Sequence, residues 1–287
     1  MAGALGLGWL MVSTAAVVTV LAAPVPPLVI AAGRVAVTGL VWMAIAGWAR
    51  VRSGRPRAEG LPHGMIGLSG ILLGAHFALW IASLSITSVV HGAVLVALQP
   101  LFAGLFGLML GERAPLLQLL GGFVVAGVGT ALLTSSAASA EGASLVGDVL
   151  AIGAAACSAL YLTVNRGIGD AVPLSSLLAR VNLIAAATVA LAIVLFGGDW
   201  WHGEARVLND GLAIVWLGLG PGLIGHGLMN WAARRVPVYV VSLVVLLEPV
   251  GAAVLAWWLL DQRFGLVEAG GALLLLIGAA IASSNRA

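Results

Sequence analysis

Two histidines stand inside long apolar stretches of this sequence, and each is followed four residues later by a side chain that can contact a ligand. His76 precedes Trp80, and His226 precedes Asn230. Residues four apart share one face of a helix, so each pair presents both side chains to the same place. A polar group inside an apolar helix usually faces a cavity or a polar partner. We therefore predict that both pairs line a substrate cavity; the alternative is that the histidines only hydrogen-bond neighbouring helices.

Two further polar residues are followed directly by proline. Glu248 precedes Pro249, and Gln99 precedes Pro100. Proline removes one backbone hydrogen bond and can kink a helix, which leaves a carbonyl oxygen free. A carboxylate and free carbonyls at one depth can bind an ammonium group or a proton. We predict that Glu248 and Gln99 contact the substrate or a coupling proton; the alternative for Glu248 is a structural hinge in which its carboxyl group caps neighbouring backbone.

Arg34 and Arg180 also lie within apolar stretches. A long arginine side chain can extend to the nearest membrane interface, which is the simplest explanation of both. A sharper hypothesis is that they form gating ion pairs with Glu112 or Asp261. Pairing with Glu248 is a third alternative, because an unpaired ionised glutamate inside an apolar helix is costly.

A third proline, Pro221, lies in the glycine-rich segment GLGPGLIGHG. Small residues let helices approach closely, and a proline flanked by glycines can bend a helix. We predict a helix kink at Pro221. Close packing is the simplest interpretation of the glycines around it, and movement of the helix at this kink is the further hypothesis. A second glycine stripe, for which close packing is the simplest interpretation, consists of Gly64, Gly67, Gly70 and Gly74.

The elements that must position these residues are membrane helices. Of the 287 residues, 61% are hydrophobic and only 8% are charged, and the mean hydropathy is +1.12. A membrane-spanning helix needs about 20 mainly apolar residues. The sequence predicts an all-α integral membrane protein whose ten spans cover residues 5–23, 28–49, 64–86, 89–109, 115–134, 146–165, 173–196, 210–231, 237–259 and 265–284.

The arginines predict the orientation of these spans, because cytoplasmic loops are enriched in basic residues. With a cytoplasmic N-terminus, the outside loops hold only Arg206 and Arg263. The inside loops and the C-terminus hold Arg50, Arg52, Arg55, Arg57, Arg113, Arg166, Arg234, Arg235 and Arg286. We predict a multi-pass protein of the bacterial inner membrane with both termini in the cytoplasm. The net charge of +2 is then a topology signal and predicts no nucleic-acid partner.

Several chemistries have no sequence signature here. The chain lacks a His-Glu-x-x-His zinc motif, a Gly-x-Ser-x-Gly nucleophile elbow and a phosphate-binding Gly-Lys-Ser/Thr loop. Its single cysteine, Cys157, permits no internal disulfide. We predict no metal, no cofactor, no catalytic residue and no obligate protein partner; the partners expected are a small-molecule substrate, the lipid bilayer and a coupling proton.

The two halves of the chain repeat each other. A shift of 146 residues places PLVIAAGR (27–34) on PLSSLLAR (173–180), and a shift of 149 places Gly129 on Gly278. The second shift also aligns Gln99 and Pro100 with Glu248 and Pro249, Glu112 with Asp261, and Gly121 and Gly122 with Gly270 and Gly271. We predict one five-helix repeat over 1–134, an external linker over 135–145 and a second repeat over 146–287. An odd number of spans per repeat inverts the second relative to the first.

The segments HFALWIASLSITSVVHGAVLVALQPLFAGLFGLMLGER, GDVLAIGAAACSALY and LLEPVGAAVLAWWLLDQR resemble both repeats of the EamA branch of the drug/metabolite transporter superfamily. The most specific elements are Glu248 with Pro249, and Gly111 with Glu112; the second repeat departs from this pattern with Leu260 and Asp261. The resemblance implies a ten-helix transporter of small metabolites that works by alternating access.

Together these features predict a secondary-active transporter that exports an amino acid. Efflux of hydrophobic or cationic drugs is the alternative within the same class, and it would need a broader, more aromatic pocket. Two alternatives come from other classes. An intramembrane enzyme could use histidine and glutamate near the bilayer centre, and a non-transporting scaffold would show no flux of any solute.

Overall fold

The computed structural model is entirely helical over the residues that it describes. These residues are 1–22, 25–53, 62–86, 95–96, 98–111, 115–133, 145–196, 207–248, 250–251, 254–255, 258 and 266–283. Pro249, Glu112, Asp261 and almost all of the predicted linker over 135–145 lie outside them.

The first half of the chain forms helices at the predicted positions. They are α1 (Ala2–Leu21), α2 (Pro27–Ser53), α3 (His63–Ile86), α5 (Gln99–Gly107), its 3-10 extension η1 (Leu108–Leu110) and α6 (Leu116–Leu133). Pro27 begins α2, where the missing N–H of proline costs no helical hydrogen bond.

The second half follows the same plan, with one irregular helix. Its helices are α7 (Leu145–Ile168), the short 3-10 turn η3 (Gly169–Ala171), α8 (Leu174–Phe196), α9 (Val207–Leu217), the π-helical segment η4 (Gly218–His226), α10 (Gly227–Ala233), α11 (Val238–Leu246) and α13 (Leu266–Ser283). The run from α9 through η4 to α10 corresponds to one predicted span, over 210–231.

Six apolar stretches in the described residues are long enough to cross a membrane: Ala2–Thr19, Leu28–Ser53, His63–Trp80, Leu145–Ala171, Leu174–Leu195 and Asp210–Ala233. The apolar helices Gln99–Leu110, Leu116–Gly129 and Ala269–Gly278 are shorter. An all-helical membrane-type fold is therefore established, whereas the number of ten spans stays a prediction. Large apolar side chains also face outward, as lipid contact requires; examples are Leu117, Val124, Leu195 and Leu273.

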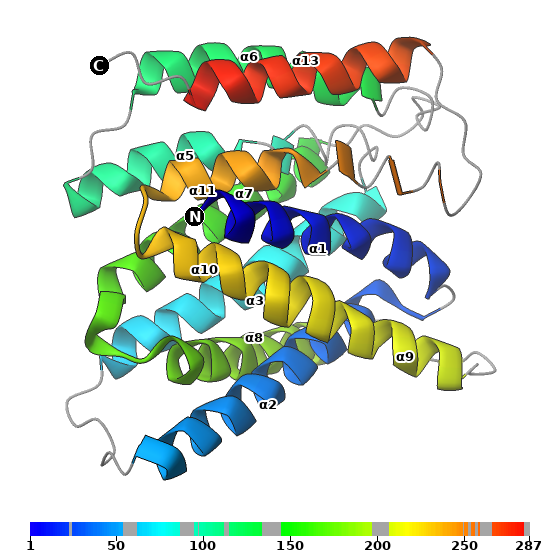
Figure 1. Ribbon diagram of the computed structural model, residues 1–287. Helices are drawn as coiled ribbons and strands as arrows, with labels where there is room; N and C mark the ends of the chain where they lie inside the picture. The colour runs from blue at the N-terminus through cyan, green and yellow to red at the C-terminus, as the bar shows by residue number, and fades with distance from the viewer. Residues whose placement is uncertain are drawn as a thin grey trace.

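Equivalent helices of the two halves pack against each other. α2 lies along α8, α5 along α11, and α6 along α13. In Figure 1, α6 and α13 run side by side at one edge of the molecule, and α2 lies at the opposite edge. The remaining large contacts join α3 to α7 and to α8, and α1 to η4. In the predicted numbering, α3 with α7 is the pair of spans three and six, and α1 with η4 is the pair of spans one and eight. The two pairs are equivalent by the repeat, because span three corresponds to span eight and span six corresponds to span one.

Glycines at repeat-equivalent positions bring α6 and α13 together. A Cβ atom added to Gly129 would overlap the backbone of Gly271 and Leu275, and one added to Gly278 would overlap the backbone of Gly122 and Ala126. The contact is thus the same from both sides, and it requires a residue without a side chain at each position.

The glycine stripe on α3 is divided between two environments. A Cβ atom on Gly70 would meet Ile184, and one on Gly74 would meet Thr188, both on α8. Gly64 and Gly67 have no atom near enough to hinder a Cβ. Close packing therefore explains only the half of the stripe nearer the C-terminus of α3.

Candidate functional site

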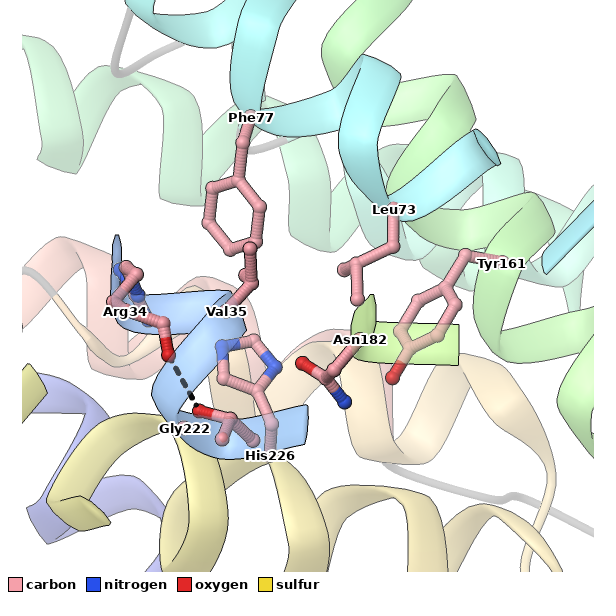
Figure 2. A pocket seen from close by; sticks show the side chains of 9 residues that line it. Arg34, Val35, Leu73, Phe77, Tyr161, Asn182, Gly222 and His226 are labelled. Carbon is pink, nitrogen blue, oxygen red and sulfur yellow. Dashed lines mark hydrogen bonds between the residues drawn. The ribbon is translucent and has the colours of Figure 1, made fainter. Parts of the chain in front are cut away.

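A narrow cavity lies where five helical segments meet, and Figure 2 shows the side chains that surround it. The lining comes from α2, α3, α7, α8 and the π-helical segment η4: Arg34, Val35, Thr38, Leu73, Phe77, Tyr161, Asn182, Gly222 and His226. The space open to the centre of a water-sized sphere is about 10 Å³, which is room for roughly one water molecule. The cavity is therefore too small to hold a metabolite in this conformation.

Arg34 supplies the positive charge of the cavity. Arg34 is only 8% exposed. Its guanidinium lies 4.9 Å from the centre of the Phe77 ring, which is a cation–π arrangement. The guanidinium interacts electrostatically with the Glu248 carboxylate. No described carboxylate forms a direct ion pair with Arg34. The Arg34 guanidinium and the Glu248 carboxyl group thus interact without a direct ion pair.

The two histidines converge around Phe77. The ring centres of His76 and Phe77 are 5.0 Å apart, and those of Phe77 and His226 are 6.5 Å apart in an edge-to-face arrangement. His226 lines the cavity. The His76 Nδ1 atom lies 2.9 Å from the carbonyl oxygen of Ala154 on α7. His76 therefore bonds a neighbouring helix and contacts Phe77, but it is not itself among the residues that line the cavity.

A series of hydrogen bonds links α3, α7 and α10 next to the cavity. Ser69 donates to the Asn165 side-chain oxygen (2.6 Å), and Asn165 donates to the Asn230 side-chain oxygen (2.8 Å). Asn230 donates to the Tyr161 hydroxyl (2.6 Å) and to the His226 carbonyl (2.8 Å). The four side chains that form these hydrogen bonds are buried, each at 2% exposure or less. The network fixes Tyr161, which lines the cavity.

We expect Asn230→Leu to destabilise the protein by about 1–3 kcal/mol, because Asn165 and Tyr161 would each lose a buried hydrogen-bond partner. Thermal unfolding of the purified protein in detergent measures the effect. Thr188→Val is the matched control, since the Thr188 hydroxyl bonds only a carbonyl of its own helix. Equal unfolding temperatures for the two variants would show that the network does not stabilise the fold.

The π-helical segment positions His226. It contains Pro221, whose ring cannot donate the backbone hydrogen bond of a regular helix, and single π-helical turns are frequent at functional sites. The Thr38 hydroxyl lies 2.8 Å from the carbonyl oxygens of Arg34 and Gly218. A Cβ atom on Gly222 would overlap the Thr38 hydroxyl. The backbone of η4 therefore packs directly on α2 beside Arg34.

The sequence matches the EamA-like transporter family over residues 2–135 and 145–284. The two matched segments together cover nearly the whole chain. The chain belongs to the EamA-like transporter family. The predicted resemblance is thereby confirmed, and the protein is a multi-pass membrane transporter of the drug/metabolite type.

A solved structure titled only "Crystal structure of protein" has the same fold as this EamA-family chain. The TM-score is 0.79 at 24% sequence identity, over 99% of this chain and 97% of the other. None of the curated proteins compared with the chain matches it. The substrate of this EamA transporter must therefore be argued from its own cavity.

The structure does not bring all of the predicted site residues of this EamA transporter to the cavity. Gln99 lies apart, where its amide is 3.4 Å from the Ser242 hydroxyl between α5 and α11. His76, Trp80, Asn230 and Glu248 are also not among the lining residues, so His226 is the one predicted substrate-binding residue that lines this cavity. Pro100 occupies the first turn of the described α5, and Arg180 lines a separate groove. Substrate contact by each of the six predicted residues stays a prediction.

The hypotheses of gating pairs with Glu112 or Asp261 concern residues outside the described part of the chain. The described electrostatic partner of Arg34 is instead Glu248. In the described part of the chain, no three His, Cys, Asp or Glu side chains come together as a metal site.

Sequence reasoning missed several residues that the EamA fold brings to the cavity. Phe77 of α3, Tyr161 of α7 and Asn182 of α8 all line it. Asn165 links Ser69 to Asn230. A rule that every asparagine inside a predicted span is a candidate would have found Asn165 and Asn182. Phe77 had no such signal, because a phenylalanine in an apolar span is ordinary.

Proposed function

We propose that this EamA-family protein is a secondary-active transporter that exports a zwitterionic amino acid. The observation that carries the proposal is that Arg34, which lines the small cavity, interacts electrostatically with Glu248 without a direct ion pair. Glu248 itself is not among the lining residues. An amino acid has a carboxylate for the guanidinium and an ammonium group for the carboxylate. Phe77 and Leu73 offer apolar surface for its side chain.

The transport cycle that we propose is alternating access by two inverted five-helix repeats, over 1–134 and 146–287, with ten spans in total. Pairing of α2 with α8, α5 with α11, and α6 with α13 supports this arrangement, because two inverted repeats meet at their equivalent helices. A cavity with room for about one water molecule corresponds to an occluded state. Substrate entry requires the helices around it to separate, and we propose that η4 bends at Pro221, which lies inside the π-helical segment.

The proposed setting is the bacterial inner membrane with both termini in the cytoplasm. The arginine distribution supports this orientation. We propose Glu248 and the histidines near Arg34 as the groups that could carry a coupling proton. We propose no cofactor, no catalytic step and no obligate protein partner.

Counterflow into proteoliposomes tests the proposed function. Vesicles with the purified protein are loaded with one unlabelled solute and diluted into a trace of the same labelled solute. The solutes are amino acids, their decarboxylated amines and cationic drugs. Accumulation of amino acids above that of amines supports the proposal. Preference for cationic drugs would replace it with drug efflux, and product formed from labelled lipid without any flux would indicate an enzyme.

We expect Glu248→Gln to lower kcat/KM for amino-acid transport by roughly 10- to 100-fold, since a charge-assisted contact to the substrate ammonium group contributes about 1.5–3 kcal/mol. Initial rates in proteoliposomes at several pH values measure this and any loss of pH dependence. Asp170→Asn is the control, because the Asp170 side chain is 96% exposed in a surface ion pair with Arg234; surface pairs contribute little. Normal kinetics and normal pH dependence in a folded Glu248→Gln protein would remove Glu248 from the site.

A further inference from the structure

A second hollow lies between α2 and α8, at the end where α2 finishes and α8 begins. It has a volume of about 230 Å³, more than twenty times that of the central cavity. Its walls are Met43, Ala46, Gly47 and Arg50 of α2, and Ser176, Ala179, Arg180 and Leu183 of α8. Nothing in the proposed transport cycle uses this groove.

Two arginines give the groove a positive charge. Arg50 comes from α2 and Arg180 from α8, and both line the same space. The Arg180 Nη1 atom is buried and has no hydrogen-bond partner among the described residues. A buried charged donor without an acceptor is costly, so an anionic group in the groove would satisfy it. No described acidic side chain lines the groove.

The other walls of the groove are suited to hydrocarbon. Met43 is 50% exposed on the outer face of α2, and Leu183 and Ala46 continue the apolar surface. Arg50 lies in the last turn of α2, near the end of the predicted span. Arg180 lies six residues into α8, roughly 9 Å along the helix. The charges thus stand at and just below a membrane interface, with apolar surface extending from them toward the bilayer centre.

We propose that the groove between α2 and α8 binds the phosphate headgroup of an anionic phospholipid, with an acyl chain lying along Met43 and Leu183. A lipid headgroup and a free phosphate ion would both bind the two arginines in the same way, because planar guanidinium groups match phosphate oxygens. The apolar walls favour the lipid, because a free ion gains nothing from them. In the proposed orientation, the lipid belongs to the cytoplasmic leaflet. This proposal does not depend on the identity of the transported solute.

Native mass spectrometry of the full-length protein in detergent tests the site. The probes are dioleoylphosphatidylglycerol, dioleoylphosphatidylcholine with the same chains, and inorganic phosphate. We expect the wild-type protein to bind the anionic lipid at least about 10-fold more tightly than the zwitterionic one. The double variant Arg50→Gln with Arg180→Gln should lose about 30-fold in affinity for phosphatidylglycerol, the factor that two basic residues supply at an anionic lipid surface.

Arg52→Gln is the matched control, because Arg52 lies at the same end of α2 but stacks over the exposed Trp48 ring at 5.3 Å and does not line the groove. Its affinity should equal that of the wild type. The single variant Arg50→Gln changes an exposed residue and keeps the test decisive if the double variant does not fold. Equal affinity for both lipids, or an unchanged affinity in Arg50→Gln and the double variant, would overturn the proposal. Competition by inorganic phosphate at the same affinity would reassign the groove to a free anion.

Discussion

Arg34→Gln is expected to lower kcat/KM for amino-acid export by about 100-fold while leaving transport of the matching decarboxylated amine within a few-fold of wild type. The guanidinium is buried beside the cavity and has no direct ion pair with a described carboxylate, which leaves it available to the substrate carboxylate. A hydrogen bond to a charged group contributes about 1.5–3 kcal/mol, a factor of roughly 10 to 150 in rate. Counterflow rates for both solutes in proteoliposomes measure the difference.

The amine separates substrate binding from general damage. A role of Arg34 that is only structural, such as its contact with Phe77, would reduce transport of acid and amine equally, and that result would contradict the proposal. Arg34→Lys provides the conservative variant. It keeps the charge but loses the planar fork of arginine, so its rate should lie between those of the wild type and Arg34→Gln.

The double variant Gly129→Ala with Gly278→Ala is expected to unfold on the order of 10 °C below the wild type. Each added methyl group would overlap backbone atoms of the opposite helix, because α6 and α13 touch at these two glycines. Forcing an extra carbon into a close contact costs about 1–3 kcal/mol, and 1 kcal/mol corresponds to roughly 2–4 °C in Tm for a chain of this size class. Differential scanning fluorimetry in detergent measures the shift.

Gly121→Ala with Gly270→Ala is the matched control for this contact. Both glycines lie on the same two helices and are repeat-equivalent, but a Cβ atom at either position meets nothing within 4 Å. Alanine favours a helix by about 1 kcal/mol over glycine, so this variant should unfold at or above the wild-type temperature. A similar loss of stability in both double variants would show that α6 and α13 do not pack as described.

Most of the architecture could be predicted from local sequence patterns. The described helices overlap the predicted spans, since hydrocarbon forces each crossing segment to satisfy its own backbone hydrogen bonds. The repeat register also translated into packing, because Gly129 and Gly278, aligned by a shift of 149 residues, meet across α6 and α13. Membership of the EamA-like transporter family followed from motifs that the sequence displays directly.

The candidate site could be predicted only in part. Polarity inside an apolar span identified Arg34, His76, His226, Asn230 and Glu248, because burial of such groups is costly wherever the helix goes. Polarity alone could not predict which of these side chains line the cavity. His226 lines the cavity, whereas Asn230 acts on it through Tyr161, and Gln99 is bonded elsewhere.

Arg34 and Arg180 show which properties of a residue the sequence determines and which depend on the tertiary structure. The sequence by itself determined that both are arginines seven residues after a repeat-equivalent proline in an apolar helix. The fold placed Arg34 over Phe77 beside His226, and Arg180 with Arg50 in a groove at the end of α2. Helix periodicity and hydrophobicity depend on neighbours along the chain, so the sequence determines the spans, the repeat and the family. The surroundings of a side chain depend on which helices pack against it, and only the tertiary structure decides those.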